Sequence, residues 1–151
     1  MVKRGLLEPV PQILVAASLM TEAVAAHRAG DRRAAASLFL ASDFQEIGHW
    51  FRTIVGPLNP DVHGRPPNPP LLPLNERKQP RMPTAETKRT IVARDGLHCR
   101  FCESPVIPKD MILAISREYP SEAPWSAVAA EQHRFFQAMT LQYDHVVPHS
   151  R

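Results

Sequence analysis

Apolar residues recur at helical spacing in two segments of the first third of the chain. Within residues 11–28 they share one face of a helix, at Ile13, Ala16, Ala17, Met20 and Val24. Within residues 32–55 a second stripe contains Ala36, Leu40, Phe44, Ile47, Phe51 and Ile54. Gly30 can end the first helix and Asp31 can cap the second, so the pattern predicts an antiparallel helical hairpin over residues 1–56.

The composition changes sharply in residues 57–83. Nine of the sixteen prolines of the chain fall in this stretch, which excludes a regular helix or sheet. The segment therefore predicts a Pro-rich linker or an extended strap on the surface. A ligand for a proline-recognition domain is an alternative, and the spacer is the favoured interpretation.

Further helices and one strand are predicted after the linker. Thr84 can cap a helix that runs to Asp95, where Gly96 ends it. Residues 98–110 are rich in turn-forming residues, and residues 122–139 predict another helix with one apolar face: Trp125, Val128, Ala129, Phe136 and Met139. Residues 141–147 predict a strand that stops at Pro148. The expected fold class is therefore α+β and mostly helical.

Composition and charge restrict the partners only weakly. The 151 residues carry a formal net charge of +3, which suits a polyanionic partner and equally suits an ordinary solvated surface. No apolar run reaches the roughly 18 residues of a membrane span, so no membrane partner is expected. Lys3 and Arg4 precede an apolar stretch, as in a signal peptide. Glu8, Pro9 and Pro11 interrupt this pattern, so a signal peptide is not the favoured interpretation. The chain has only two cysteines, which is too few for a disulfide scaffold, so we expect the protein in the reducing cytoplasm.

Cys99 and Cys102 stand at the C-x2-C spacing that can hold one tetrahedral Zn²⁺ through a tight turn. Two reduced thiols without a metal are the alternative, and a redox pair would need a βαβ context that the pattern does not predict. No histidine lies at a finger-like spacing from Cys102, so the pair supplies half of a zinc site. Basic residues nearby can favour thiolates, contact phosphates or simply form a solvated face: Lys88, Arg89, Arg94 and Arg100.

Asp144 and His145 form a second candidate site at the end of the predicted strand. A carboxylate is a good ligand for Mg²⁺ or a similar divalent ion, and an imidazole can take a proton from an attacking water. Because adjacent strand residues point to opposite faces, a local distortion would have to bring the two side chains together. The dipeptide alone is common and does not define a site.

The two motifs together resemble the HNH endonuclease family. The resemblance covers residues 84–151 and consists of Arg94-Asp95-Gly96, Cys99-x-x-Cys102, and Asp144-His145-Val146-Val147-Pro148 with Ser150-Arg151. It implies a ββα-metal domain that hydrolyses phosphodiester bonds in nucleic acid, expected to be DNA. His145 would be the general base, Asp144 a ligand of the catalytic Mg²⁺ or similar ion, and the cysteines half of a structural Zn²⁺ site. The expected contacts to nucleic acid are Arg94, Arg100, His149 and Arg151.

The chain departs from the family pattern in two places. The stretch between Cys102 and Asp144 is long for the family. The Gly-Gly turn, the Asn, the metal-binding helix and the second C-x2-C that the family places after its Asp-His motif are not found. The resemblance therefore predicts an incomplete HNH domain, and we expect the 151 residues alone not to cleave DNA.

Two other interpretations use the same residues differently. In one, the cysteines and basic residues form a zinc-dependent nucleic-acid-binding module without catalysis, and Asp144-His145 is structural. In the other, the hairpin over residues 1–56 binds a partner and the rest of the chain is a degenerate remnant. The hairpin lies outside the resemblance, so the sequence does not choose its role.

Overall fold

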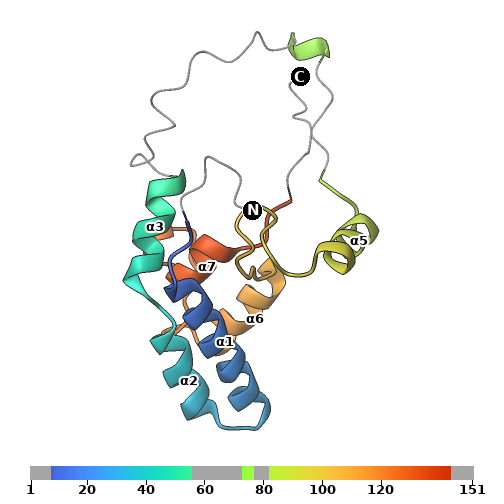
Figure 1. The fold of residues 1–151 in the computed structure, drawn as a ribbon. Coiled ribbons are helices and arrows are strands. Elements are labelled where there is room, and N and C mark those ends of the chain that lie inside the picture. Colours follow the sequence, from blue (N-terminus) through green and yellow to red (C-terminus); the bar gives the residue numbers. More distant parts are fainter. Residues whose placement is uncertain (1–7, 56–72, 77–81, 144–151) are drawn as a thin grey trace.

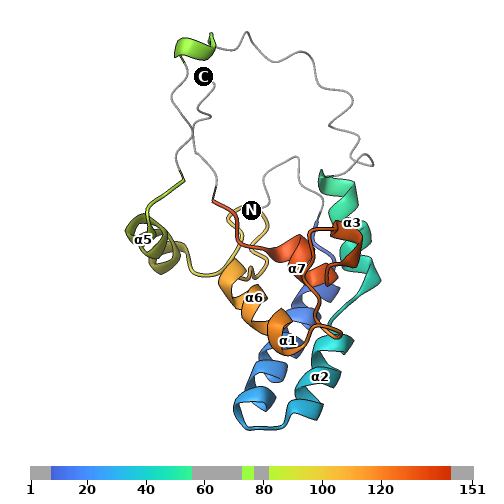
Figure 2. The ribbon, with the colours of Figure 1, turned by 180° about the vertical axis from the view of Figure 1, so that it is seen from behind.

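The computed structural model describes residues 8–55, 73–76 and 82–143, and helices form most of this part (Figures 1 and 2). In chain order the helices are α1 (Gln12–Arg28), α2 (Arg32–Ala41), α3 (Gln45–Val55), the 3-10 helix η1 (Leu74–Glu76), α5 (Ala85–Asp95), α6 (Lys109–Glu118), the 3-10 helix η2 (Ala129–Glu131) and α7 (Arg134–Met139). None of the described helices has the length and apolar character that crossing a bilayer would need.

Helices α1 and α2 form the predicted antiparallel pair (Figure 1). Gly30 adopts a φ of 85°, a conformation that glycine takes without steric cost, and it reverses the chain after α1. The Asp31 carboxylate then accepts a hydrogen bond from the Ala34 backbone N–H at 2.9 Å and caps α2. Ala16, Ala23 and Ala35 are fully buried, because small side chains let the helices approach closely.

The single helix predicted over residues 32–55 is wrong, because the chain breaks it into α2 and α3. Ser42 follows the last residue of α2, and its hydroxyl donates to the Phe39 carbonyl at 2.7 Å. Such a local side-chain bond competes with continuation of the helix. Asp43 instead turns toward Arg134, far along the chain.

The α+β expectation and the ββα-metal domain are also wrong. Across residues 8–55, 73–76 and 82–143 the structure contains no strand, and only two isolated bridges occur, His98–Pro105 and Ile107–Thr140. Within the predicted strand over residues 141–147, residues 141–143 are not in a strand, and 144–147 lie outside the described residues.

The helix predicted over residues 122–139 is wrong for most of its length. Only α7, at the end of this range, is an α-helix, and the short 3-10 helix η2 precedes it. Ser126 stabilises the irregular part, because its hydroxyl accepts from the Val128 N–H at 3.0 Å and donates to Glu131 at 2.8 Å. The His133 N–H donates to the Pro124 carbonyl at 2.8 Å and fixes the loop before α7 begins. Helix α6 was not anticipated by the sequence pattern.

One hydrophobic core joins the N-terminal helices to α6 and α7. Phe39 of α2, Ile47 of α3, Ile112 of α6 and Phe136 of α7 are all within 1% of complete burial. Helix α5 contributes no buried residue, and Figures 1 and 2 show it at the side of the molecule opposite α3. The turn with the two cysteines follows α5 directly.

Candidate functional site

Cys99 and Cys102 lie in a tight turn that connects α5 to α6. The Cys99 carbonyl accepts from the Glu103 N–H at 2.8 Å, and the Cys99 N–H donates to the Ser104 carbonyl at 2.8 Å. One step farther out, the Val106 N–H donates to the Leu97 carbonyl at 2.9 Å. These bonds close a small hairpin around the C-x2-C sequence, so the predicted turn between the cysteines is confirmed.

Glu103 lets the chain reverse directly after the second cysteine. Its φ of 60° lies in the left-handed region, where a residue with a side chain is uncommon. The flanking bonds of Cys99 hold this conformation in place. The strained residue therefore coincides with the end of the C-x2-C motif, where chain reversal is needed.

Both cysteines are free and half-buried, so their sulfurs are available to a ligand. The Cys102 thiol donates a weak hydrogen bond to the Ser104 hydroxyl at 3.3 Å, and Ser104 itself is buried. Arg100 and Phe101, between the cysteines, are exposed. Two thiols can supply two of the four ligands of tetrahedral Zn²⁺. Among the residues that the structure describes, no third His, Cys, Asp or Glu joins them in a metal-binding group.

Residues 140–143 lie beside this turn although they are about forty positions away in sequence. The Ile107 N–H donates to the Met139 carbonyl at 2.8 Å, and the Leu141 N–H donates to the Ile107 carbonyl at 2.9 Å. The Lys88 ammonium of α5 lies 5.4 Å from the centre of the Tyr143 ring, within cation–π range. The segment that leads to Asp144 is thereby held against both α5 and the cysteine hairpin.

Four of the predicted site residues fall beyond the part of the chain that the structure describes. Asp144, His145, His149 and Arg151 lie outside the described residues, so the structure neither joins nor separates the predicted base and the predicted metal ligand.

The two predicted phosphate-binding arginines that the structure describes differ in their surroundings. Arg94 forms two hydrogen bonds of 2.7 Å to Asp95, through Nε and Nη2. The Arg94 hydrogen bond lowers the pKa of Asp95, so the carboxylate stays charged and offsets the arginine. Arg100 is exposed on the cysteine hairpin. Of the two, Arg100 is better placed to meet an anion.

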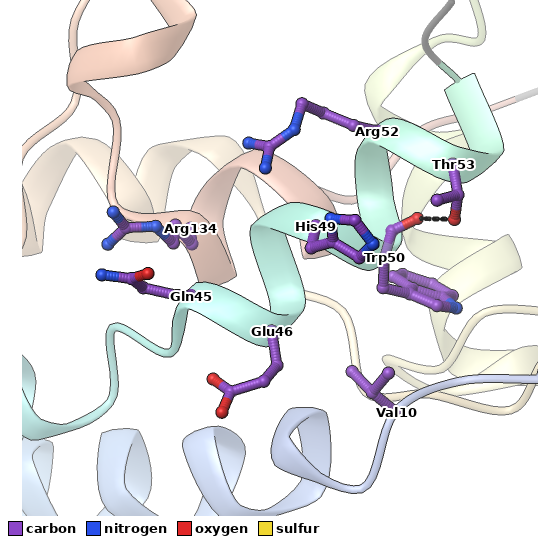
Figure 3. A pocket seen from close by; sticks show the side chains of 8 residues that line it. All are labelled: Val10, Gln45, Glu46, His49, Trp50, Arg52, Thr53 and Arg134. Atoms are coloured by element: carbon purple, nitrogen blue, oxygen red, sulfur yellow. Dashed lines mark hydrogen bonds between the residues drawn. The ribbon is translucent and has the colours of Figure 1, made fainter. Parts of the chain in front are cut away.

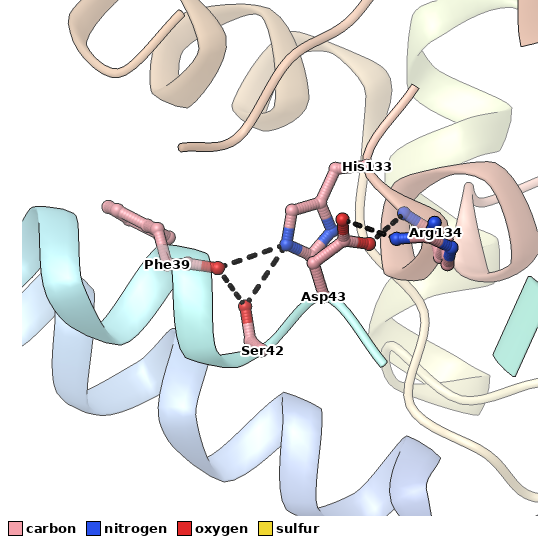
Figure 4. Close-up of polar contacts among 5 residues, drawn as sticks. All are labelled: Phe39, Ser42, Asp43, His133 and Arg134. Carbon is pink, nitrogen blue, oxygen red and sulfur yellow. Dashed lines mark hydrogen bonds and ion pairs between the residues drawn. The ribbon is translucent and has the colours of Figure 1, made fainter. Parts of the chain in front are cut away.

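Sequence reasoning missed a buried polar cluster between α2 and α7 (Figure 4). The His133 Nε2 lies 3.0 Å from the Phe39 carbonyl oxygen and 3.2 Å from the Ser42 hydroxyl. The side chains of His133 and Ser42 are fully buried. Next to them, Arg134 donates to Asp43 through its backbone N–H at 2.8 Å and through Nη1 at 2.7 Å. The Ser42-Asp43 pair is a sequence signal for a helix end, which the prediction of one helix over residues 32–55 did not use, and it does not indicate a partner.

The Ser-His-Asp composition of this cluster does not make it a nucleophilic site. The Ser42 hydroxyl donates to the Phe39 carbonyl rather than to the imidazole, and a substrate cannot reach it. Desolvation lowers the pKa of His133, and this outweighs the opposing effect of Asp43. With a proton on Nε2, the histidine is a neutral donor that ties α7 to the end of α2. The cluster is therefore structural.

A shallow groove of about 640 Å³ runs along the exposed side of α3 (Figure 3). Its lining consists of Val10, Gln45, Glu46, His49, Trp50, Arg52, Thr53 and Arg134. Gly48 lets the Arg134 stem lie on α3, since a Cβ there would be 3.1 Å from the Arg134 Cδ. Arg134 is paired with Asp43 beside the groove, and the lining contains both a carboxylate, Glu46, and a second arginine, Arg52, so the charge of the groove selects no class of ligand.

Comparison with known proteins does not identify a function for the chain. No family model matches the chain, and no match was found among curated proteins or among solved structures.

Proposed function

We propose that the protein is an HNH-type endonuclease that hydrolyses phosphodiester bonds in DNA with the help of a divalent metal ion. The proposal concerns the chemistry of the motif residues and not the ββα fold. The observation that carries it is the order of the two motifs, the C-x2-C pair and the later Asp144-His145. The contacts of Ile107 with residues 139–141 support it, because they bring the approach to the second motif next to the first.

In this proposal the residues divide the chemistry between them. His145 takes the proton from the attacking water. Asp144 holds the divalent ion, which when bound stabilises the negative charge that develops on the phosphate. Cys99 and Cys102 contribute to a structural zinc site that stiffens the hairpin. Arg100 and, beyond the described residues, His149 and Arg151 contact the backbone phosphates. A reducing compartment such as the cytoplasm keeps the two thiols reduced.

The test is cleavage of supercoiled plasmid with Mg²⁺ or Mn²⁺, using the protein at the full length that its gene encodes. We expect His145→Ala to lower the cleavage rate by about 10²- to 10⁴-fold, because a positioned general base contributes about that much. Asp144→Ala should cause a similar loss that excess metal ion does not restore. His49→Ala, a change on the exposed side of α3, is the matched control and should cleave at the wild-type rate. Undiminished cleavage by His145→Ala would show that His145 is not the base.

A zinc-dependent nucleic-acid-binding module is the second candidate, and one observation favours it. The cysteine hairpin forms and Arg100 is exposed on it in the described part of the chain, without any contribution from Asp144 or His145. Such a module should bind DNA with an affinity that falls as salt rises, since phosphate contacts release counterions. Salt-dependent binding without metal-dependent cleavage, in the same full-length protein, would select this function over the nuclease.

A further inference from the structure

Cys99 and Cys102 lie three positions apart within a single closed turn. The Glu103 N–H donates to the Cys99 carbonyl at 2.8 Å, which is the bond of one helical turn that does not continue. In helical geometry the Cα atoms of residues i and i+3 are roughly 5 Å apart. A disulfide joins Cα atoms that are about 4.4–6.8 Å apart. The backbone of the turn therefore holds the two cysteines at a separation that a disulfide can span.

A disulfide also requires the two Cβ atoms to come closer, and the end of the turn can absorb this movement. On a helix surface, Cβ atoms three positions apart are separated by about 5–6 Å, whereas a disulfide needs about 3.5–4.5 Å. Glu103 leaves the helical region with a φ of 60°, so no further helical turn fixes Cys102. A shift of about 1 Å is thereby confined to this turn, and the buried Ile107 farther along the chain need not move.

Both thiols are available for reaction. The two side chains are half-buried, and both cysteines are free. The Cys102 thiol donates only a weak hydrogen bond, 3.3 Å long, to the Ser104 hydroxyl. A small disulfide in solution, such as glutathione disulfide, can therefore reach the sulfurs.

We infer that Cys99 and Cys102 form a reversible disulfide within one chain, by exchange with a small disulfide such as glutathione disulfide. One cysteine thiolate attacks a sulfur of glutathione disulfide, which forms a mixed disulfide and releases one glutathione. The thiolate of the other cysteine then attacks the first cysteine's sulfur in the mixed disulfide, which closes the Cys99–Cys102 bond and releases the second glutathione. The two cysteines lose two electrons and two protons, and glutathione disulfide is reduced to two glutathione thiols.

The disulfide acts as a switch on the surface of the hairpin. Arg100 and Phe101 lie between the two cysteines and are exposed, so closing the bond changes how these side chains are presented. Because the cysteines undergo the exchange and do not catalyse it in other proteins, this role needs no βαβ context. Sulfurs joined in a disulfide are no longer thiolates and cannot hold a metal ion, so the disulfide and a zinc site exclude each other. The exchange needs neither DNA nor a metal ion, so its test is separate from that of the proposed nuclease.

The test incubates the native full-length protein with glutathione buffers of increasing disulfide content. Acid stops the exchange, and intact-mass spectrometry identifies the products. We expect a mass lower by two hydrogen atoms, peptides that place the bond between Cys99 and Cys102, and full reversal by dithiothreitol. The glutathione concentrations at half-conversion give the effective concentration of one thiol at the other. Because the folded turn holds the pair together, this effective concentration should be at least about tenfold higher in the native protein than in urea.

Single-cysteine variants separate the two steps of the exchange. Cys99→Ser and Cys102→Ser should each stop at the mixed disulfide, with a mass higher by one glutathionyl group, because no second thiol can resolve it. Ser126→Ala, a change in the loop before η2, is the control and should close the bond at the wild-type glutathione ratio.

The wild-type protein alone can overturn the inference, even if a variant fails to fold. An effective concentration no higher in the native protein than in urea would do so, because the folded turn would then not favour the bond. A native protein that does not react with glutathione disulfide would overturn it as well. So would a mixed disulfide that persists in the wild-type protein, or a disulfide that joins two chains.

Discussion

At the scale of single residues, the conformation of Glu103 carries the most information about the cysteine hairpin. It is the only non-glycine residue among those described with a positive φ. The left-handed region costs an L-residue about 1–2 kcal/mol relative to glycine, and the cost is greatest for β-branched side chains. The bonds of Cys99 to Glu103 and Ser104 offset this cost. Strain at this position is therefore the consequence of reversing the chain directly after Cys102.

Substitutions of Glu103 test that strain. Glu103→Val should lower the free energy of unfolding by about 1–2 kcal/mol, whereas Glu103→Gly should leave it unchanged or raise it by up to about 1 kcal/mol. Urea denaturation followed by circular dichroism measures both. Glu46→Val, at an exposed helical position of α3, is the control and should cost about 0.5 kcal/mol. Equal effects of Val and Gly at position 103 would contradict the assignment of strain.

The buried His133 makes the stability of the fold depend on pH. Desolvation lowers the pKa of His133 in the folded protein, so the unfolded chain binds a proton more readily. The stability that the neutral imidazole contributes is complete above the unfolded pKa near 6.5 and is lost as pH falls below it.

Urea unfolding at pH 7.5 and at pH 5.5 checks this dependence. The wild-type protein should lose stability between the two values, by at most about 1.4 kcal/mol per pH unit. His133→Asn should be less stable at pH 7.5 by about 2–4 kcal/mol, because it loses buried packing and hydrogen bonds, and its remaining pH dependence should be smaller. His49→Asn, at an exposed position, should keep the wild-type profile. An unchanged profile in His133→Asn would assign the pH dependence to another group.

At the scale of elements, short-range signals in the sequence were predictive and long-range ones were not. The Asp31 cap of α2 and the Thr84 cap of α5 both involve a backbone N–H three residues later, and both helix starts were predicted to within a residue. By contrast, Asp43 lies in the break between α2 and α3 and bonds to Arg134 across 91 positions. The irregular loop before α7 likewise depends on the contact of His133 with Phe39. The spacing of apolar residues along the chain does not indicate which distant residues will pair in this way.

Two variants of Asp43 separate its hydrogen bond with the Arg134 backbone N–H from its ion pair with the Arg134 side chain. Asp43→Asn keeps an oxygen for the Arg134 backbone N–H and removes the charge, which should cost about 0.5 kcal/mol because the pair is partly exposed. Asp43→Ala removes both and should cost about 1–2 kcal/mol. Asp31→Ala, which removes only a local cap, should cost about 1 kcal/mol. Chemical denaturation ranks the three, and an Asn variant as damaged as the Ala variant would show that the charge dominates.

At the scale of the whole molecule, the sequence could predict part of the candidate site and little of the arrangement around it. The C-x2-C spacing predicted the turn at Cys99 and Cys102, because four consecutive residues determine it. The contact of Ile107 with Thr140 was not predictable, because it depends on how α6 and α7 pack on the N-terminal hairpin. The expected strand failed for a related reason. The Leu141 N–H bonds to the Ile107 carbonyl beside the isolated Ile107–Thr140 bridge, and Tyr143 lies against Lys88, so residues 141–143 do not join a sheet.

The shared core implies that the N-terminal helices and the C-terminal helices unfold together. Trp50 belongs to α3, and its indole N–H donates to the Glu8 carbonyl at 3.0 Å; Trp125 packs against the same core from the loop after α6. Single-tryptophan proteins made by Trp125→Phe and Trp50→Phe therefore report on the two parts separately. Each should show one urea transition, and adding Phe136→Ala should lower the unfolding free energy of both by about 3–5 kcal/mol, because it opens a cavity at a fully buried position. If only the Trp125 signal shifted, the two parts would be separate folding units, and the core that joins them would contribute little.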